Sequence, residues 1–185
     1  MRRELRDTAT LKTGLFAKPE AKGDLVYLQV KHFDENGLLK TEIYPDLMED
    51  KVTEKHLLSD GDILFAAKGT KNFATVYENH NPPAVASTSF FVIRVKEKGL
   101  LPQFLAWYLN QPSTLKKLKE QATGTAILSI SKAMLEDLEI PEPEKRIQYV
   151  ILQISALMRR ENEIQNRLSE LRETKIQKQI FERIK

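Results

Sequence analysis

Residues 144–185 constrain the fold of this chain most, because they contain neither glycine nor proline, the residues that most often end a helix. Apolar residues recur there at the alternating steps of three and four that define a heptad seam, with Glu161 at the polar position between them. We call the seven apolar members the apolar stripe: Ile147, Val150, Ile154, Leu157, Ile164, Leu168 and Leu171. The pattern predicts one helix, roughly 60 Å long at about 1.5 Å per residue.

A helix of this kind is not stable alone, because its apolar stripe must be covered by a partner. Two arrangements would cover it: folding back onto the rest of the chain, or pairing with another chain. Nothing later in the sequence supplies a covering segment. We therefore expect the stripe to be a dimerisation surface, paired with a second copy of the chain or with another helical protein.

Pro141 and Pro143 mark one division of the chain, into domains 1–142 and 143–185. The first domain has short apolar runs bounded by turn residues such as Asn36-Gly37 and Asp60-Gly61. This pattern is typical of an α+β fold with an irregular or barrel-like sheet, followed by a single long C-terminal coiled-coil helix. The expected strands cover 24–30, 62–67, 71–77 and 87–95, and the expected helices cover 102–109, 114–120 and 132–135, the last capped by Ser131.

Composition excludes several classes of protein. The absence of cysteine excludes a disulfide scaffold, a thiolate zinc site and a cysteine nucleophile. The three histidines are far apart, without the spacing of metal ligands, so no metal site is expected. No apolar run approaches the roughly 20 residues of a membrane span, and the first residues lack a signal-peptide core. We therefore expect a cytoplasmic chain without a membrane partner.

The sequence contains look-alikes of catalytic motifs, but none has the context that its chemistry needs. Asn81-Pro82-Pro83-Ala84 resembles the Asn-Pro-Pro-aromatic motif of amino-group DNA methyltransferases, yet Ala84 cannot stack on a flipped base. No glycine-rich cofactor loop precedes it. The acidic residues between Asp46 and Asp50 lie too close in sequence to sit on two strands of a nuclease site. We therefore expect a non-enzymatic chain that binds no cofactor of its own.

The charge distribution points to a polyanionic partner. The overall net charge is only +3, but residues 63–135 carry nine lysines and arginines against three acids. The acidic stretches 1–62 and 136–143 flank this basic part. One basic face is what a nucleic-acid-binding protein needs. An ordinary solvated surface is the alternative interpretation.

Six short motifs occur in the order found in the specificity subunits of type I restriction–modification systems. The first, Leu58–Thr70 (LSDGDILFAAKGT), resembles that family's Gly-Asp-Ile-Leu strand followed by Gly-Thr. The others are the polar run 86–89 before a strand, the helix LPQFLAWYL at 101–109, the Gly-Thr-Ala to Ile-Ser segment at 123–131, the exit LEIPEP at 138–143, and the long helix with its Gln148. The resemblance covers nearly the whole chain.

Typical members of that family hold two target-recognition domains and two long helices, and this chain holds one of each. The resemblance thus implies a half-length specificity subunit. Such a subunit must form a homodimer to rebuild the full arrangement, and two identical readers imply a bipartite palindromic target. Glu142 departs from the pattern, because the family often has an apolar residue there.

The resemblance also implies a set of partners. They are double-stranded DNA, a DNA methyltransferase subunit that binds S-adenosylmethionine and flips the adenine, and, as an open further partner, a motor-nuclease subunit. The chain itself then selects the DNA sequence and catalyses no reaction. A coiled-coil protein-interaction adaptor with no DNA role remains the alternative, because the same helix fits it and residues 1–62 are acidic on balance.

Base reading requires donors and acceptors at the groove edges, and phosphates require cations. Three polar segments offer this chemistry, and for each the alternative is a turn whose side chains bond its own backbone. The candidate DNA-binding residues are Lys68, Gly69, Thr70, Lys71 and Asn72 in the first segment, Thr123, Thr125, Ser129, Ser131 and Lys132 in the second, and Ser87, Thr88 and Ser89 in the third. Lys12 and Thr13 are further candidates.

Overall fold

The structure is a computed structural model that describes residues 2–34, 37–40, 43–69, 71–78, 83–121 and 129–184. The chain divides into two compact units, Met1–Lys145 and Arg146–Lys185. The domain boundary predicted from the sequence, between residues 142 and 143, lies three residues before this division. The first unit is an α+β domain and the second is helical, so the predicted fold class is confirmed.

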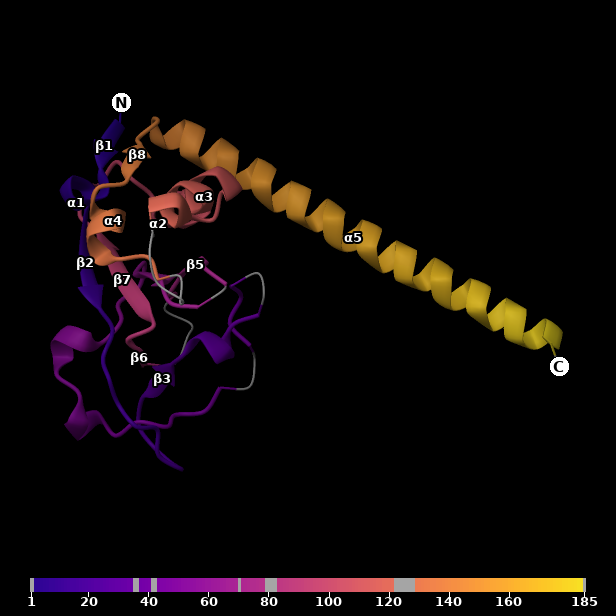
Figure 1. Cartoon of the computed structure of the whole chain (residues 1–185), viewed down its shortest axis with the longest axis horizontal. Helices are drawn as coiled ribbons and strands as arrows, with labels where there is room; N and C mark the ends of the chain where they lie inside the picture. Colours follow the sequence, from indigo (N-terminus) through magenta and orange to yellow (C-terminus); the bar gives the residue numbers. More distant parts are fainter. Residues whose placement is uncertain are drawn as a thin grey trace. The chain divides into compact units, whose positions relative to one another are not determined.

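A four-stranded sheet with strand order β2-β7-β4-β5 forms the centre of the first unit. Its strands are β2 (Ala9–Thr13), β7 (Phe90–Val95), β4 (Ile63–Ala66) and β5 (Ala74–Val76). Strands β2 and β7 lie side by side in Figure 1. Every neighbouring pair is antiparallel. The ends of β2 and β4 and the starts of β7 and β5 therefore lie at one edge of the sheet, and the loops at that edge are neighbours.

Two smaller sheets complete the unit. β1 (Arg2–Glu4) pairs antiparallel with β8 (Glu139–Pro141), which brings the first residues beside the segment that leads into the long helix (Figure 1). β3 (Val26–Leu28) pairs in parallel with β6 (Ala84–Ala86). The short elements between strands are α1 (Leu5–Thr8) and the 3-10 turns η1 (Val30–His32), η2 (Glu49–Lys51) and η3 (Glu54–His56).

The core lies around β4, whose four residues are all buried. Phe33, Phe73 and Phe90 pack there with ring centroids 5.4 to 6.0 Å apart, in tilted and edge-to-face arrangements. Aromatic pairs of this geometry contribute about 0.5–1.5 kcal/mol each beyond the burial of their surface. Phe73 belongs to the loop between β4 and β5, so this cluster anchors the loop from inside.

Three helices follow the sheet strands: α2 (Pro102–Leu109), α3 (Pro112–Gln121) and α4 (Lys132–Glu136). Pro102 occupies the first turn of α2, where a missing N–H is tolerated. Asn110, just after α2, accepts a hydrogen bond from the N–H of Ala74 (2.8 Å) and donates one to its carbonyl (2.7 Å). The end of α2 is thereby fixed to the start of β5.

The second unit consists of the helix α5 (Lys145–Ile184), as the glycine- and proline-free segment predicted. All seven members of the apolar stripe are exposed, by 45% for Leu168 up to 70% for Leu157. Exposed ion pairs such as Arg160–Glu163 and Arg167–Glu170, one turn apart, accompany the stripe. Within the described part of the chain, no helix is long and apolar enough to cross a membrane.

Several expected elements are present with different bounds, and others were missed. The expected strands 24–30, 62–67, 71–77 and 87–95 are each shorter, because turn and bridge residues flank the paired segments. The strands β1, β2, β6 and β8 and the helix α1 were not predicted. The Asp60-Gly61 turn is confirmed, since the N–H of Asp62 bonds the carbonyl of Ser59 (3.0 Å) and Gly61 has a φ of +82°.

Candidate nucleic-acid interface

The three sequence-predicted polar segments converge just beyond the end of β4. The N–H of Ala67 donates to the carbonyl of Ser89 (3.0 Å), and the N–H of Ile130 donates to the carbonyl of Ala67 (3.0 Å). Lys68 and Ser129 form a β-bridge beside these bonds. Ala67, the residue that follows β4, is therefore hydrogen-bonded both to the segment 87–89 and to the segment 129–132. We call the described residues of 67–72, 87–89 and 129–132 the loop edge.

The segment 67–72 forms the loop of the β4–β5 hairpin. The N–H of Ala66 bonds the carbonyl of Phe73 (2.8 Å), which closes the loop at its base. Gly69 has a φ of +103°, a conformation that favours glycine. Apart from its chain neighbours, no described residue has a heavy atom within 4 Å of the position that a Cβ would take. Lys68 and Lys71 are exposed and form no ion pair with a described residue. The loop therefore presents two free cations next to an open backbone.

The side chain of Asn72, a predicted DNA-binding residue, has a hydrogen-bond partner within the protein. Its side-chain nitrogen donates a 2.9 Å hydrogen bond to the carbonyl of Ala66, across the base of the hairpin loop. This bond fits the alternative given above for each polar segment, in which a side chain of a turn bonds the turn's own backbone. The amide group that a bidentate contact with adenine would need is thus engaged within the protein.

The segment 87–89 is a tight turn, closed by a bond from the N–H of Phe90 to the carbonyl of Ser87 (2.9 Å). Ser87 is only 4% exposed, and its Oγ has no hydrogen-bond partner among the described residues. A buried hydroxyl does not favour contact with a base edge, so the DNA-binding role of Ser87 stays a prediction that its burial does not support. Thr88 and Ser89 are half-buried and line the loop edge.

In the third segment, Ser129 is exposed and bridged to the first segment. Ser131 caps α4, because its Oγ accepts a 3.2 Å bond from the N–H of Met134, which confirms the predicted cap. Lys132 is exposed and forms an i,i+4 ion pair with Glu136 at 3.3 Å. An exposed pair of this kind is weak and leaves the lysine available to a phosphate. The predicted residues Thr70, Thr123 and Thr125 lie outside the described residues.

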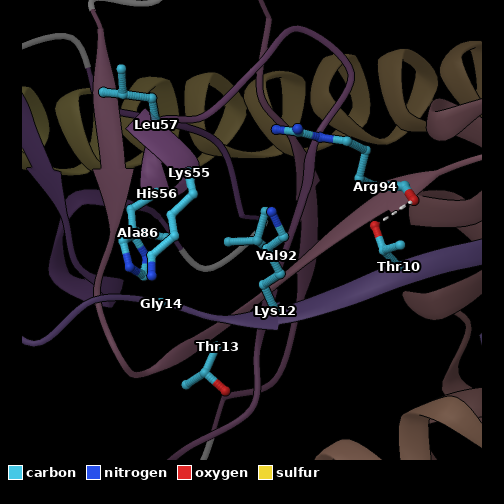
Figure 2. Close-up of a pocket in the computed structure, with 10 residues that line it drawn as sticks. All are labelled: Thr10, Lys12, Thr13, Gly14, Lys55, His56, Leu57, Ala86, Val92 and Arg94. Carbon is cyan, nitrogen blue, oxygen red and sulfur yellow. Dashed lines mark hydrogen bonds between the residues drawn. The ribbon is translucent and has the colours of Figure 1, made fainter. Parts of the chain in front are cut away.

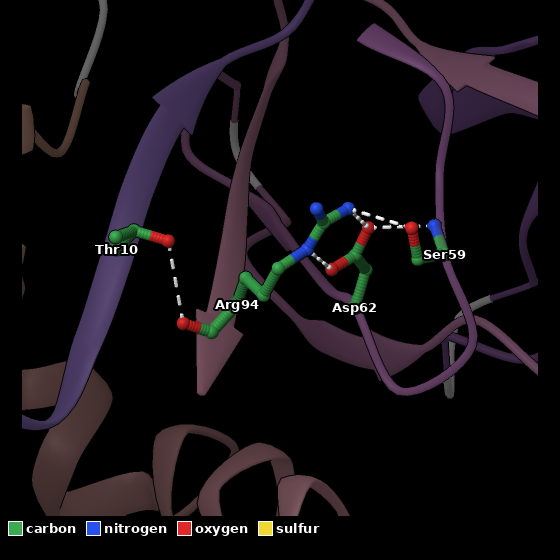
Figure 3. A network of polar contacts seen from close by, with 4 residues as sticks. All are labelled: Thr10, Ser59, Asp62 and Arg94. Atoms are coloured by element: carbon green, nitrogen blue, oxygen red, sulfur yellow. Dashed lines mark hydrogen bonds and ion pairs between the residues drawn. The ribbon is translucent and has the colours of Figure 1, made fainter. Parts of the chain in front are cut away.

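A polar network holds the turn that precedes β4 (Figure 3). Asp62 is buried, and Arg94 of β7 bonds both of its carboxylate oxygens, while the N–H of Ser59 bonds one of them (2.8 Å). Arg94 also donates to the hydroxyl of Ser59 (2.9 Å). The hydrogen bonding of the Arg94 guanidinium to the Asp62 carboxylate raises the pKa of Arg94. The network fixes β4, and with it the loop edge, against β7.

Sequence reasoning missed Phe16, an aromatic side chain that is 78% exposed just beyond β2. The buried Tyr27 holds the backbone on both sides of it. The Tyr27 hydroxyl donates to the carbonyl of Leu15 (2.8 Å) and accepts from the N–H of Ala17 (3.2 Å). β2 ends at the same sheet edge as β4, so Phe16 follows a strand that leads to the loop edge. No pattern in the sequence distinguishes this phenylalanine from those of the core.

A basic pocket lies on the face of β2 and β7, and sequence reasoning missed it as well. Its lining residues include Lys12, Lys55, His56 and Arg94 (Figure 2). Lys12 was a candidate from sequence, whereas Lys55 and His56 were not. In the described ranges, no group of three or more histidine, aspartate or glutamate side chains is arranged to hold a metal ion.

Comparisons with known proteins agree with this architecture. The HsdS subunit of Thermoanaerobacter tengcongensis has a similar fold, with a TM-score of 0.61 and 17% identity over 87% of this chain and 37% of that one. The S subunit of a type I restriction-modification system of M. genitalium has a TM-score of 0.59 and 17% identity, over 85% of this chain and 38% of that one. A third similar chain comes from a structure of complex assembly and conformational transition of the type I R-M system. It has a TM-score of 0.60 and 19% identity, over 92% of this chain and 43% of that one.

This chain thus spans less than half the length of the solved chains that it matches. No curated protein matches it in sequence. A family model does match: that of the type I restriction modification DNA specificity domain, over residues 3–173. The match covers both the sheet domain and most of α5, so the chain belongs to the family of type I restriction modification DNA specificity domains.

Proposed function

We propose that the chain chooses the DNA sequence on which a methyltransferase partner acts in a type I restriction–modification system. The convergence of three polar segments on one sheet edge is the observation that carries this proposal. Lys68, Lys71 and Lys132 place exposed cations there, beside the half-buried hydroxyls of Thr88 and Ser89. Cations that hold phosphates next to groups that can bond base edges are what a DNA reader requires.

In this proposal the chemistry belongs to the partner. The methyltransferase subunit binds S-adenosylmethionine and methylates an adenine, and a motor-nuclease subunit joins the complex for cleavage. The chain contributes a reader whose hairpin loop is closed at its base by the hydrogen bond from the N–H of Ala66 to the carbonyl of Phe73.

We further propose that two copies pair through the apolar stripe of α5. Seven apolar side chains, each roughly half exposed, follow heptad spacing along one face of this helix. A helix of this kind is stabilised when knobs from a second helix cover its seam. Two copies related by a two-fold axis present two identical loop edges, so the target is bipartite and palindromic.

Selection from a random DNA duplex library tests the reader. The full chain, alone and with its methyltransferase subunit, is incubated with the library, and the retained duplexes are sequenced. Enrichment of one motif supports the proposal. Retention without any motif, or no retention in either form, favours the protein-interaction adaptor with no DNA role.

Molar mass in solution tests the pairing. We expect twice the chain mass of 21.3 kDa at micromolar concentration. Leu157→Glu with Leu168→Glu should yield a monomer, because the two carboxylates lie in the seam. Asn162→Glu with Asn166→Glu adds the same charge off the stripe and should leave the dimer intact. A monomeric wild type contradicts the proposal. So does an equal change of molar mass in the two pairs of glutamate substitutions.

A further inference from the structure

The basic pocket lies on one face of the sheet, between β2, β7 and the 3-10 turn η3 (Figure 2). Lys12 projects from β2 on the side that faces η3, while its neighbour Thr13 points to the other side of the strand, as alternation along a strand requires (Figure 2). Lys55 and His56 come from η3, and Arg94 from β7. None of the lining residues is acidic.

The charges of this pocket are largely uncompensated. Arg94 is neutralised by the buried carboxylate of Asp62, which accepts two hydrogen bonds from it. Lys12 and Lys55 are exposed, and neither forms an ion pair with any described residue. The imidazole of His56 is half-buried beside them and adds a further hydrogen-bonding nitrogen. Two free ammonium groups in a hollow without acids favour an anion with several acceptor oxygens, such as a phosphate.

The pocket is joined to the loop edge through the backbone. Lys12 precedes Gly14, which lines the pocket and whose N–H bonds the carbonyl of Phe90 (3.1 Å). A Cβ on Gly14 would lie 2.1 Å from the carbonyl oxygen of Ser87, so only glycine allows this close approach. Ser87 begins the turn 87–89 of the loop edge. A group bound in the pocket is thus held in register with the loops.

We infer that this pocket binds a backbone phosphate of the same DNA whose bases the loop edge reads, an inference that rests on the proposed function. Phosphate contacts fix the position and orientation of a protein on the duplex but do not distinguish sequences. Lys12 and Lys55 hold the phosphate oxygens, and His56 donates or accepts a hydrogen bond at the rim. The pocket then sets the register from which the loop edge reaches the bases.

The test compares two pairs of lysine substitutions on a mixed-sequence duplex of about 30 base pairs, a length that covers several phosphates on each strand. The pocket pair is Lys12→Ala with Lys55→Ala. The control pair is Lys96→Ala with Lys98→Ala, which removes the same charge from exposed lysines beyond the other end of β7. The binding constant of the full chain is measured across salt concentrations for wild type and both pairs.

Loss of one phosphate contact should reduce the slope of log K against log salt by about 0.9. We expect this reduction for the pocket pair and an unchanged slope for the control pair. The motif recovered from a duplex library should be the same in all three proteins. Thermal unfolding of each protein shows whether it is folded, and Lys12→Gln with Lys55→Gln replaces the alanine pair if that pair is not.

Equal slopes in wild type, pocket pair and control pair overturn the inference while leaving the reader proposal intact. Failure of the wild type to bind any duplex at low salt, both alone and with its methyltransferase subunit, removes the reader proposal itself, and the inference with it. Inorganic phosphate, titrated against the full chain by NMR, separates a free anion from DNA as the source. Saturable binding of phosphate that Lys12→Ala with Lys55→Ala abolishes, combined with an unchanged DNA slope, assigns the pocket to a free anion and overturns the inference.

Discussion

Arg94 and Asp62 form the most buried ion pair described in the sheet domain, with two hydrogen bonds of 2.6 Å between guanidinium and carboxylate. The Asp62 side chain is 1% exposed, whereas that of Arg94 is 46% exposed. The pair joins β7 to the turn that leads into β4. It therefore fixes the strand from which the hairpin loop of the loop edge emerges.

Removal of the guanidinium should destabilise the domain. Arg94→Met leaves the buried carboxylate with only the N–H of Ser59, and we expect the free energy of unfolding to fall by about 1–3 kcal/mol. Arg94→Lys should recover part of the loss, because it restores a charge without the bidentate geometry. Urea unfolding of the three proteins measures this. Equal stability of Arg94→Met and wild type would show that the pair contributes nothing.

Tyr27→Phe should loosen the segment that carries Phe16. The substitution leaves the carbonyl of Leu15 and the N–H of Ala17 without the hydroxyl that both now bond, and we expect a loss of about 1–2 kcal/mol. Tyr44→Phe is the matched control, because Tyr44 is 75% exposed. Urea unfolding gives the free energies, and amide hydrogen exchange at Ala17 should accelerate only in Tyr27→Phe. Unchanged exchange there would refute the clamp.

His32 should make the domain less stable in mild acid. Burial lowers the pKa of His32 from 6.5, and Lys31 and Lys40 lower it further while Asp46 opposes them. The neutral imidazole accepts a 3.3 Å hydrogen bond from the N–H of Gln29, which protonation would remove. Its contribution is present above pH 6.5 and is lost as the pH falls through the lower folded-state pKa.

The free energy of unfolding, measured by urea between about pH 8 and pH 5, tests this prediction. It should decrease toward the acid end in wild type. His32→Gln retains a hydrogen-bond acceptor without the titration, so its decrease should be smaller. Parallel curves for the two proteins would exclude His32 as a source of the pH dependence.

Asn72 and Lys71 should separate stability from binding. Asn72→Ala removes the bond to the carbonyl of Ala66, so we expect a loss of about 0.5–1.5 kcal/mol in the free energy of unfolding and an unchanged sequence preference. Lys71→Ala should leave stability unchanged and weaken binding to every sequence, because a phosphate contact is lost. Unfolding and library selection measure the two effects. A relaxed preference in Asn72→Ala would restore the base-reading role first expected for it.

The helices were the most predictable part of the fold, because their signals are local. Glycine- and proline-free heptads indicated α5, and Ser131 indicated the start of α4. The strands were less predictable. β6 (Ala84–Ala86) has three small apolar residues without alternation, and it is a strand only because β3 pairs with it in parallel. Such pairing depends on residues more than fifty positions away.

The candidate site shows the same division. The sequence indicated Lys68, Lys71 and Lys132 as cations in polar segments, and the structure shows that all three are exposed. The sequence did not distinguish Ser87 from Ser89, because the burial of Ser87 depends on the turn closed by Phe90. The roles of Lys55 and His56 were also hidden, since a short 3-10 turn carries them to the face of β2 and β7. Proximity in space decides these roles, and local sequence does not encode it.

The most direct test of the central claim is a map of the bases methylated by the proposed methyltransferase partner, read by single-molecule sequencing of DNA. With the wild-type chain we expect one bipartite palindromic motif, and without the chain no motif. With Lys68→Ala and Lys71→Ala together we expect the same motif at lower occupancy, because these lysines hold phosphates. Methylation of the same motif in the absence of the chain would contradict the claim that this chain chooses the sequence.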